Sequence, residues 1–279
     1  MMIDAISDMW IIDAFTEHAF RGNAAAVCLM DKFPADAAMQ KIAALMNLSE
    51  TAFVVKTGPL HYNLRWFTPE TEVNLCGHAT LAATHVLVQS GQLRQGDIVT
   101  YATLSGPLKA KVLAKGIELD FPTLAGVKTR PHTALKNLGV DIVACEINRD
   151  NYLVEVKDFE TLLACAPNFK RLAKLDRQGV IVTTATGVVG FDFASRYFCP
   201  SLGINEDPVT GSAHCFLAPY WAAKLGKPSF HAFQASKGRG ILDVTLTGER
   251  TLIAGTCVTT LKGKLPATRP SPRIKDIAC

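Results

Sequence analysis

Short runs of β-branched and aromatic residues recur along most of the chain and predict a protein that consists largely of β-strands. Glycine, asparagine and proline separate these runs, as turns between strands require. The runs predict strands at residues 52–56, 62–67, 98–102, 108–113, 117–121, 180–183, 191–198, 242–246 and 251–260.

Hydrophobic residues three or four positions apart predict helices at residues 35–47, 79–90 and 213–225, and a weaker pattern of this kind covers residues 159–172. The helices at 79–90 and 213–225 are apolar over most of their circumference. A helix of that kind must be enclosed by other elements. We therefore expect each of these two helices to lie inside a sheet.

A motif in the first half of the chain recurs in the second half. Arg65-Trp66-Phe67-Thr68-Pro69 precedes Cys76-Gly77-His78-Ala79, and Arg196-Tyr197-Phe198-Cys199-Pro200 precedes Thr210-Gly211-Ser212-Ala213. In both copies the glycine comes just before one of the apolar helices. The second copy has a three-residue insertion between its proline and its glycine, but the order of the parts is unchanged. The pattern indicates a duplication.

The length of 279 residues and the repeat predict two domains. We expect an α+β fold of two pseudosymmetric domains, each a curled, mostly antiparallel and barrel-like sheet around a central helix. The two helix N-termini would face one another across a cleft. Prolines at positions 122 and 131 mark the boundary, which gives domains at 1–125 and 126–264. Residues 265–279, rich in proline and basic residues, are expected to form a disordered tail.

Composition restricts the partners and the compartment. The net charge is only +4 and the basic residues are scattered, so we expect no nucleic-acid partner. No apolar stretch reaches the roughly 20 residues needed to cross a bilayer, and Asp4 and Asp8 stand where a signal peptide would be basic and apolar. The eight cysteines form no CxxC pair, which favours reduced thiols. We expect a cytoplasmic protein, and base rates alone favour a homodimer.

The two predicted helix starts are the candidate binding site. A helix N-terminus has unpaired N–H groups and about half a positive charge, so it binds carboxylates and oxyanions without a metal. Gly77 and Gly211 would let a ligand approach the backbone closely. Capping by Thr210 or Ser212 is the structural alternative for a single helix. The presence of two such starts favours a site for a small carboxylate-bearing metabolite.

Three ionisable residues lie near these starts in the sequence. The positive helix end would keep His78 neutral and able to exchange a proton, although a single helical histidine is usually structural. Asp207 precedes the second helix, whose dipole would stabilise its carboxylate, unless it only caps the chain before Pro208. Partial burial of Glu50 before the apolar run 51–55 would raise its pKa toward a range useful for acid–base catalysis, unless it is a surface residue.

The sequence predicts neither a metal site nor a nucleotide site. Histidine and cysteine show neither HxxxH nor CxxC spacing. Gly238-Arg239-Gly240 does not complete a dinucleotide fingerprint, and no Walker A pattern occurs. We therefore expect no metal and no cofactor.

Several motifs in order resemble the PhzF-like, phenazine biosynthesis-like proteins. They are Asp13-Ala14-Phe15, Phe20-Arg21-Gly22-Asn23, Ser49-Glu50-Thr51-Ala52-Phe53, Arg65-Trp66-Phe67-Thr68-Pro69, Cys76-Gly77-His78-Ala79-Thr80 and Asp207-Pro208-Val209-Thr210-Gly211-Ser212-Ala213. The resemblance implies the diaminopimelate epimerase fold and a metal-free, cofactor-free isomerase. The activity best understood in that family isomerises trans-2,3-dihydro-3-hydroxyanthranilate by moving a proton between ring carbons.

The resemblance also implies roles for individual residues. Glu50 would be the acid/base that carries the proton, and His78, Asp207 and Ser212 would position the substrate or assist the transfer. Ser49 and the backbone amides around Gly77 and Gly211 would bind polar groups of the substrate.

Two other functions stay open at this point. An amino-acid racemase or epimerase of the same fold would need a thiol from each half, and Cys76 could supply the first. The second half has residues 207–211 where the other thiol would be expected, so we expect Cys76 to be a buried packing residue. A metabolite-binding protein without catalytic activity is the other alternative.

Overall fold

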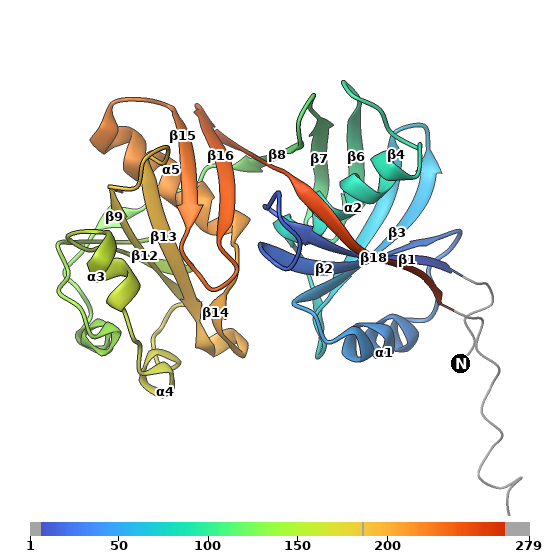
Figure 1. Ribbon diagram of the computed structural model, residues 1–279. Coiled ribbons are helices and arrows are strands. Elements are labelled where there is room, and N and C mark those ends of the chain that lie inside the picture. The colour runs from blue at the N-terminus through green and yellow to red at the C-terminus, as the bar shows by residue number, and fades with distance from the viewer. Residues whose placement is uncertain (1–6, 186, 266–279) are drawn as a thin grey trace, which may run out of the picture.

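The computed structural model describes residues 7–185 and 187–265, which form two lobes side by side (Figure 1). The helices are α1 (Asp36–Met46), α2 (Gly77–Gln89), α3 (Phe159–Ala164), α4 (Phe169–Leu172) and α5 (Gly211–Leu225), with 3-10 turns η1 (Thr133–Leu138) and η2 (Pro200–Leu202). None of the helices in these residues combines the length and the apolar character needed to cross a membrane.

Each lobe is a curled sheet. Across the first lobe the strands are β18 (Cys257–Leu265), β1 (Ser7–Ala14), β2 (Asn23–Met30), β3 (Glu50–Gly58), β4 (His61–Phe67), β6 (Ile98–Thr103), β7 (Gly106–Val112) and β8 (Ile117–Pro122), with β5 (Glu72–Val73) beside β4. Across the second lobe they are β9 (Val127–Lys128), β10 (Ala144–Ile147), β11 (Asn151–Glu155), β12 (Gly179–Ala185), β13 (Phe193–Cys199), β15 (Ser229–Gln234), β16 (Gly240–Thr247) and β17 (Arg250–Gly255), with β14 (Ile204–Asp207) beside β13. Antiparallel pairing of β8 with β17 joins the two sheets.

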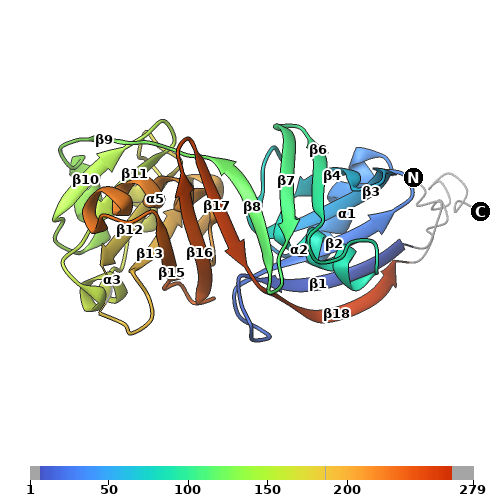
Figure 2. The same ribbon diagram turned by 90° about the horizontal axis from the view of Figure 1, so that it is seen from above.

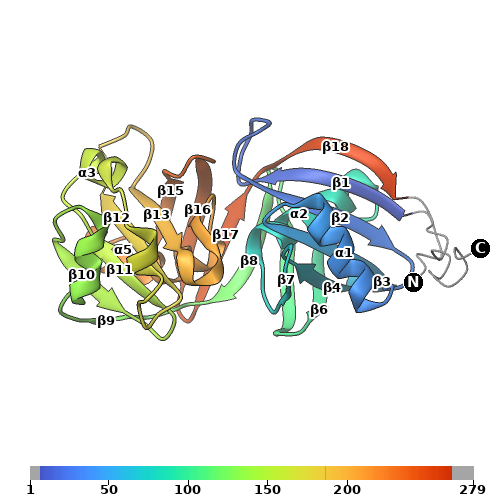
Figure 3. The same cartoon turned by 90° about the horizontal axis from the view of Figure 1, so that it is seen from below.

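The predicted α+β fold of two pseudosymmetric curled sheets is confirmed. Most strand pairs are antiparallel, and the parallel ones, β2–β3, β4–β6, β11–β12 and β13–β15, occupy corresponding places in the two lobes. One apolar helix lies within each sheet, α2 in the first and α5 in the second, and most of its residues are buried. The shorter helices α1 and α3 lie on the outside of their lobes (Figure 3).

The duplication is visible in matching ion pairs. Arg65 on β4 makes a two-pronged contact with Glu72, with both N···O distances 2.7 Å. Arg196 on β13 makes the same contact with Glu206, at 2.8 and 2.9 Å. Seven residues separate the first pair and ten the second, because the second copy contains the short turn η2. Each two-pronged ion pair fixes the hairpin that leads into a central helix.

The chain passes between the lobes twice, after β8 and after β17 (Figure 2). After the second passage β18 pairs with β1 along the whole of that strand, from Ala14 opposite Cys257 to Ser7 opposite Leu265. The last strand therefore completes the first lobe. The predicted boundary near residue 125 stays a prediction. Leu265 belongs to β18, and the rest of the predicted tail, 266–279, lies outside the described residues.

Some predicted elements were wrong in type or extent. The weak helix at 159–172 is two helices, α3 and α4, because the extended backbone at Cys165 and the proline at 167 interrupt it. The single strand predicted at 251–260 is β17 and β18, separated at Thr256. Strands β1, β2, β10, β11 and β15 were not predicted, and neither were the short strands β5, β9 and β14. In β2, whose middle is buried on both faces, an alanine-rich run replaces the alternation that marks a half-buried strand.

Gly22 is the residue whose backbone the fold restricts most tightly. Its φ of 71° lies in the left-handed region, and a Cβ there would be 2.1 Å from the carbonyl oxygen of Ala14. Its N–H donates to the carbonyl oxygen of Gly238 in the second lobe at 2.7 Å. Gly22 thus joins the two lobes directly before β2 begins.

Replacement of Gly22 by alanine should therefore lower the free energy of unfolding by about 3 kcal/mol or more, because it adds a backbone clash to the left-handed strain. Gly91→Ala is the matched control, since Gly91 has φ 73° but has nothing within 4 Å of its added Cβ. It should cost only about 1–2 kcal/mol. Chemical denaturation measures both values, and equal losses in the two variants would contradict the prediction.

Candidate active site

The central helices α2 and α5 begin at the same place, between the two lobes. A Cβ added to Gly77 would lie 3.8 Å from Cα of Gly211, and one added to Gly211 would lie 3.9 Å from Cα of Gly77. The expected meeting of the two helix starts is thus present. Neither N-cap residue, Cys76 or Thr210, makes a side-chain cap to its helix. The positive ends of two helices therefore converge, and neither N-cap side chain accepts a hydrogen bond from the first N–H groups of its helix.

Glu50 and His78 form the charged pair of this site. Glu50 is the first residue of β3, and His78 is the second residue of α2. His78 Nε2 lies 3.1 Å from Glu50 Oε2, and their side chains are only 7% and 14% exposed. The contact is close enough for an ion pair, but neither atom has a hydrogen bond of good geometry within the described structure. Both atoms are buried, so solvent screens the attraction between them only weakly.

The protonation of this pair differs from the sequence-based expectation. Burial would lower the pKa of His78, but its contacts with Cys76 and with the Glu50 carboxylate outweigh burial and hold the pKa well above the ordinary value. Burial would raise the pKa of Glu50, but His78 and the Cys76 thiol outweigh it and the pKa falls below its ordinary value. The predictions of a neutral His78 and a raised Glu50 pKa were wrong, because each residue is the other's partner and the sequence does not show this.

Asn23, the first residue of β2, connects the two halves of the site. Its Nδ2 lies 2.9 Å from Asp207 Oδ1, 3.1 Å from the carbonyl oxygen of Val209 and 3.3 Å from His78 Nδ1. Its Oδ1 accepts a hydrogen bond from the Ser49 hydroxyl at 3.0 Å. One amide therefore connects Ser49 of the first lobe to Asp207 and Val209 of the second lobe, next to His78.

Asp207 is the last residue of β14, and its side chain is held on both oxygens. Besides the Asn23 contact, Asp207 Oδ2 accepts from the Thr210 hydroxyl at 2.6 Å. Burial raises the pKa of Asp207 to about 6, although His78, Thr210 and Asn23 favour its ionised form. Desolvation has the largest effect on this carboxyl group, and the expected stabilisation of the carboxylate by the helix dipole stays a prediction.

Thr210 does not cap α5, since its hydroxyl is directed to Asp207. The side chain of Gln234, from β15, accepts from the Thr210 N–H at 2.8 Å and donates to the Asp207 carbonyl oxygen at 2.9 Å. Ser212, the second residue of α5, has an exposed side chain, and it too makes no cap. The alternative of ordinary capping by Thr210 or Ser212 is therefore wrong.

Sequence reasoning missed Asn23, Thr210 and Gln234 as site residues. Asn23 is the first residue of a strand that was not predicted, and Gln234 is the last residue of another. The only available signal was the position of Asn23 within the opening motif and of Thr210 next to Gly211.

Cys76, Glu50 and His78 are the group that comes nearest to a metal site in the described residues, with ligand atoms within 4.8 Å of one another. Cys76 Sγ lies 3.4 Å from His78 Nδ1, whereas Glu50 faces Nε2 of the same ring. One metal ion binds only one of the two ring nitrogens, whereas the contacts of His78 with Cys76 and Glu50 use different ones. The arrangement fits a chain of proton-exchanging groups better than a metal centre.

The sequence matches the family model described as phenazine biosynthesis-like protein over residues 12–263. The chain belongs to this family. The resemblance seen in its motifs is thereby confirmed, and the site lies at the residues that carry those motifs.

Curated relatives of this phenazine biosynthesis-like protein match along nearly their whole length. An uncharacterized isomerase of Halalkalibacterium halodurans is 44% identical over 261 residues, which is 92% of this chain and 97% of the relative. A phenazine biosynthesis-like domain-containing protein of Homo sapiens is 39% identical over 285 residues, 93% of this chain and 99% of the relative.

Solved structures agree with the fold. A phenazine biosynthesis protein of the PhzF family from Enterococcus faecalis is 40% identical, with a TM-score of 0.89 over 94% of this chain and 100% of that chain. A hydroxyproline epimerase from Agrobacterium vitis has a TM-score of 0.61 over 95% and 94% of the two chains at 12% identity, so its likeness concerns the fold alone.

The raised pKa of Asp207 has a consequence for stability. The folded protein retains this proton up to about pH 6, whereas the unfolded chain releases it near 3.8. Folding therefore takes up a proton in this range, and the Asp207 contribution to stability falls as pH rises from about 4 to 6. Asp207→Asn removes this titration. Between about pH 4 and 6 the free energy of unfolding should therefore fall less in the variant than in the unchanged protein, by up to roughly 3 kcal/mol. Urea denaturation at several pH values measures the difference, and parallel profiles for the two proteins would contradict it.

Proposed function

We propose that this protein is a cofactor-independent isomerase that moves a proton on a small carboxylate-bearing metabolite. The observation that carries the proposal is the convergence of two uncapped helix starts beside the buried Glu50–His78 pair. The names of curated relatives, which include isomerases of Halalkalibacterium halodurans and Pseudomonas aeruginosa, support the reaction class.

The first step is capture of the substrate carboxylate by the two helix starts. Backbone N–H groups in the first turn of α2 and α5 supply donors, and the absence of side chains at Gly77 and Gly211 permits close approach. The exposed hydroxyl of Ser212 is placed to bind a polar group at the same helix start. Binding of an anion here also offsets the repulsion between two like helix ends.

Proton removal by Glu50 is the second step. Its lowered pKa keeps the carboxylate ionised, which is the form that acts as a base. As the C–H bond breaks, negative charge develops on the substrate and its conjugated carboxylate. The protonated His78 and the helix N–H groups are preorganised to meet that charge, and one such donor typically contributes a few kcal/mol.

Delivery of the same proton to another carbon completes the reaction. Protonated Glu50 returns the proton it removed, so the substrate changes only the position of one hydrogen and its double bonds. Asn23 acts on this step through its hydrogen bond to Asp207, which in turn holds Thr210 at the second helix start. The substrate class that fits is an unsaturated ring acid of the dihydro-hydroxyanthranilate type.

Cys76 argues against a two-thiol racemase. Burial, reinforced by Glu50, raises the pKa of the Cys76 thiol to about 11, which leaves little thiolate at neutral pH. With Gly77 aligned on Gly211, the residue that corresponds to Cys76 is Thr210, and its hydroxyl donates to Asp207. A single carboxylate base accounts for these residues better than a symmetric pair of thiols.

Deuterium exchange with two probes distinguishes these mechanisms. In heavy water the protein should isomerise trans-2,3-dihydro-3-hydroxyanthranilate, as followed by NMR, and deuterium should appear at the receiving carbon in those turnovers in which protonated Glu50 exchanges with solvent before it returns the proton. Glu50→Gln should reduce the rate by about 10²–10⁴-fold because the base is lost. Cys76→Ala, a change of similar size in the same cluster, should stay within about tenfold of the unchanged protein.

The opposite ranking, an active Glu50→Gln beside an inactive Cys76→Ala, would overturn the proposed base. Exchange at Cα of trans-4-hydroxy-L-proline that depends on Cys76 would indicate the racemase chemistry instead. Binding of both probes without isomerisation or any exchange at carbon would favour a binding protein.

Cofactor independence has a separate test. Dialysis of the protein against EDTA should leave the isomerisation rate unchanged, because the proposed charge stabilisation comes from backbone N–H groups and His78. A rate that falls after dialysis and returns with one added metal ion would contradict it.

A further inference from the structure

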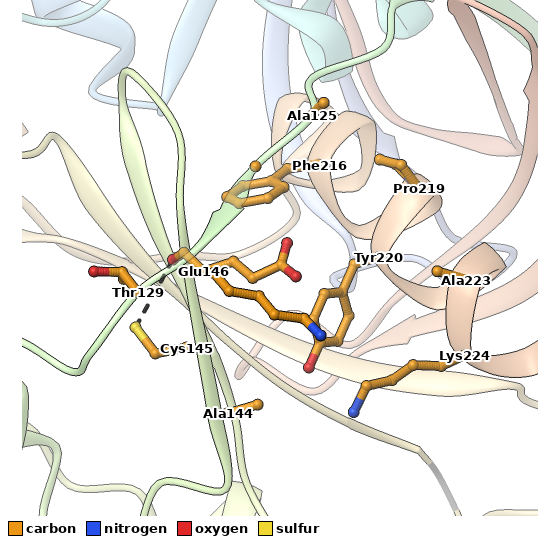
Figure 4. A pocket seen from close by; sticks show the side chains of 12 residues that line it. Ala125, Thr129, Ala144, Cys145, Glu146, Phe216, Pro219, Tyr220, Ala223 and Lys224 are labelled. Atoms are coloured by element: carbon orange, nitrogen blue, oxygen red, sulfur yellow. Dashed lines mark hydrogen bonds between the residues drawn. The ribbon is translucent and has the colours of Figure 1, made fainter.

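A cavity of about 620 Å³ lies in the second lobe along the middle and end of α5 (Figure 4). Its walls include Phe216, Pro219 and Tyr220 from α5 on one side and residues around β9 and β10 on the other. None of the ionisable residues of the Glu50–His78 site lines it. Its volume is in the range of cavities that hold small molecules.

The two lobes differ at this place, and the difference explains the cavity. With Gly77 aligned on Gly211, His85 and Gln89 of α2 correspond to Pro219 and Ala223 of α5. In the first lobe β18 covers that face, and Thr259 contacts His85 at 3.2 Å and Gln89 at 2.7 Å.

The counterpart of β18 in the second lobe is β9, which follows the same kind of crossing between lobes. It has two residues, whereas β18 has nine. The corresponding face of α5 is thus left open, and Pro219 and Ala223 line the cavity instead of packing under a strand.

Two opposite charges border this cavity without neutralising each other. Lys128 on β9 and Glu146 on β10 are directly opposite in the strand pair, yet in the described part of the chain no ion pair joins them or occupies either one. Figure 4 shows the carboxylate of Glu146 directed into the cavity. Because no ion pair occupies either group in the described residues, both can bind a ligand that carries both charges.

The remaining polar groups of the cavity are already satisfied. Lys224 forms an ion pair with Glu155, and the Tyr220 hydroxyl donates to the same carboxylate at 2.7 Å. Lys224 also lies over the Tyr220 ring, 5.1 Å from its centroid. These contacts hold the aromatic wall in place, so the cavity offers one apolar surface and one unpaired charge of each sign.

We propose that this cavity is a second ligand site, which takes a zwitterionic amino acid with an apolar side chain. Its ammonium group binds Glu146, its carboxylate binds Lys128, and its side chain packs against Phe216, Pro219 and Tyr220. The site is independent of the proposed isomerase reaction, although α5 runs from one site to the other.

Isothermal titration calorimetry with L-phenylalanine tests the proposal on the full-length protein. Phenethylamine lacks the carboxylate and 3-phenylpropionate lacks the ammonium, so each should bind at least fivefold more weakly than L-phenylalanine. Glu146→Gln and Lys128→Met should each weaken L-phenylalanine binding at least fivefold. Glu249→Gln and Lys170→Met, which alter exposed charges elsewhere in the second lobe, should leave the affinity unchanged.

Several results would overturn the proposal. L-phenylalanine that does not bind up to about 20 mM would do so, as would analogues that bind as tightly as the amino acid. An affinity that is unchanged in Glu146→Gln or in Lys128→Met would also contradict it. Glu50→Gln should not change the affinity, and a loss in that variant alone would place the ligand at the Glu50–His78 site instead. Failure of the isomerase assay leaves every one of these outcomes unaffected.

Discussion

The contact between the starts of α2 and α5 is the constraint on which the rest of this structure depends. Two helix ends of like partial charge meet at Gly77 and Gly211, and neither is capped by a side chain. Such an arrangement is electrostatically unfavourable unless negative groups lie nearby. Glu50 and Asp207 supply them from the ends of strands. In the proposed function the same field that requires these carboxylates also attracts the anionic substrate, so the stability of the site and its proposed chemistry would have one origin.

Duplication followed by divergence explains how such a site arises between two similar lobes. The two-pronged ion pairs of Arg65 with Glu72 and of Arg196 with Glu206 place each helix start in the same way. The residues around the starts have diverged, with Cys76 and His78 on one side and Thr210 and Ser212 on the other. The outer edges have diverged as well, since β18 closes the first lobe while the two residues of β9 leave the second partly open.

Much of this architecture could be predicted because it is recorded locally in the sequence. Helices that are apolar all round must be enclosed, and the repeated motif placed Gly77 and Gly211 in equivalent positions. The predictions that were wrong or missing concern contacts between residues that are far apart in the sequence. His78 and Glu50 determine each other's pKa across 28 positions, and β18 pairs with β1 at the other end of the chain. Asn23 had no visible partner in the sequence, although it bonds to Asp207, 184 residues away.

Binding of a carboxylate between the helix starts is the central claim, and backbone amide NMR tests it most directly. In a titration of the ¹⁵N-labelled protein with 2-aminobenzoate, the amide signals of Gly77 and Gly211 should shift together along one saturation curve. Signals at both glycines that do not move, or a shift at only one of them, would contradict the claim that the two helices form a single anion site.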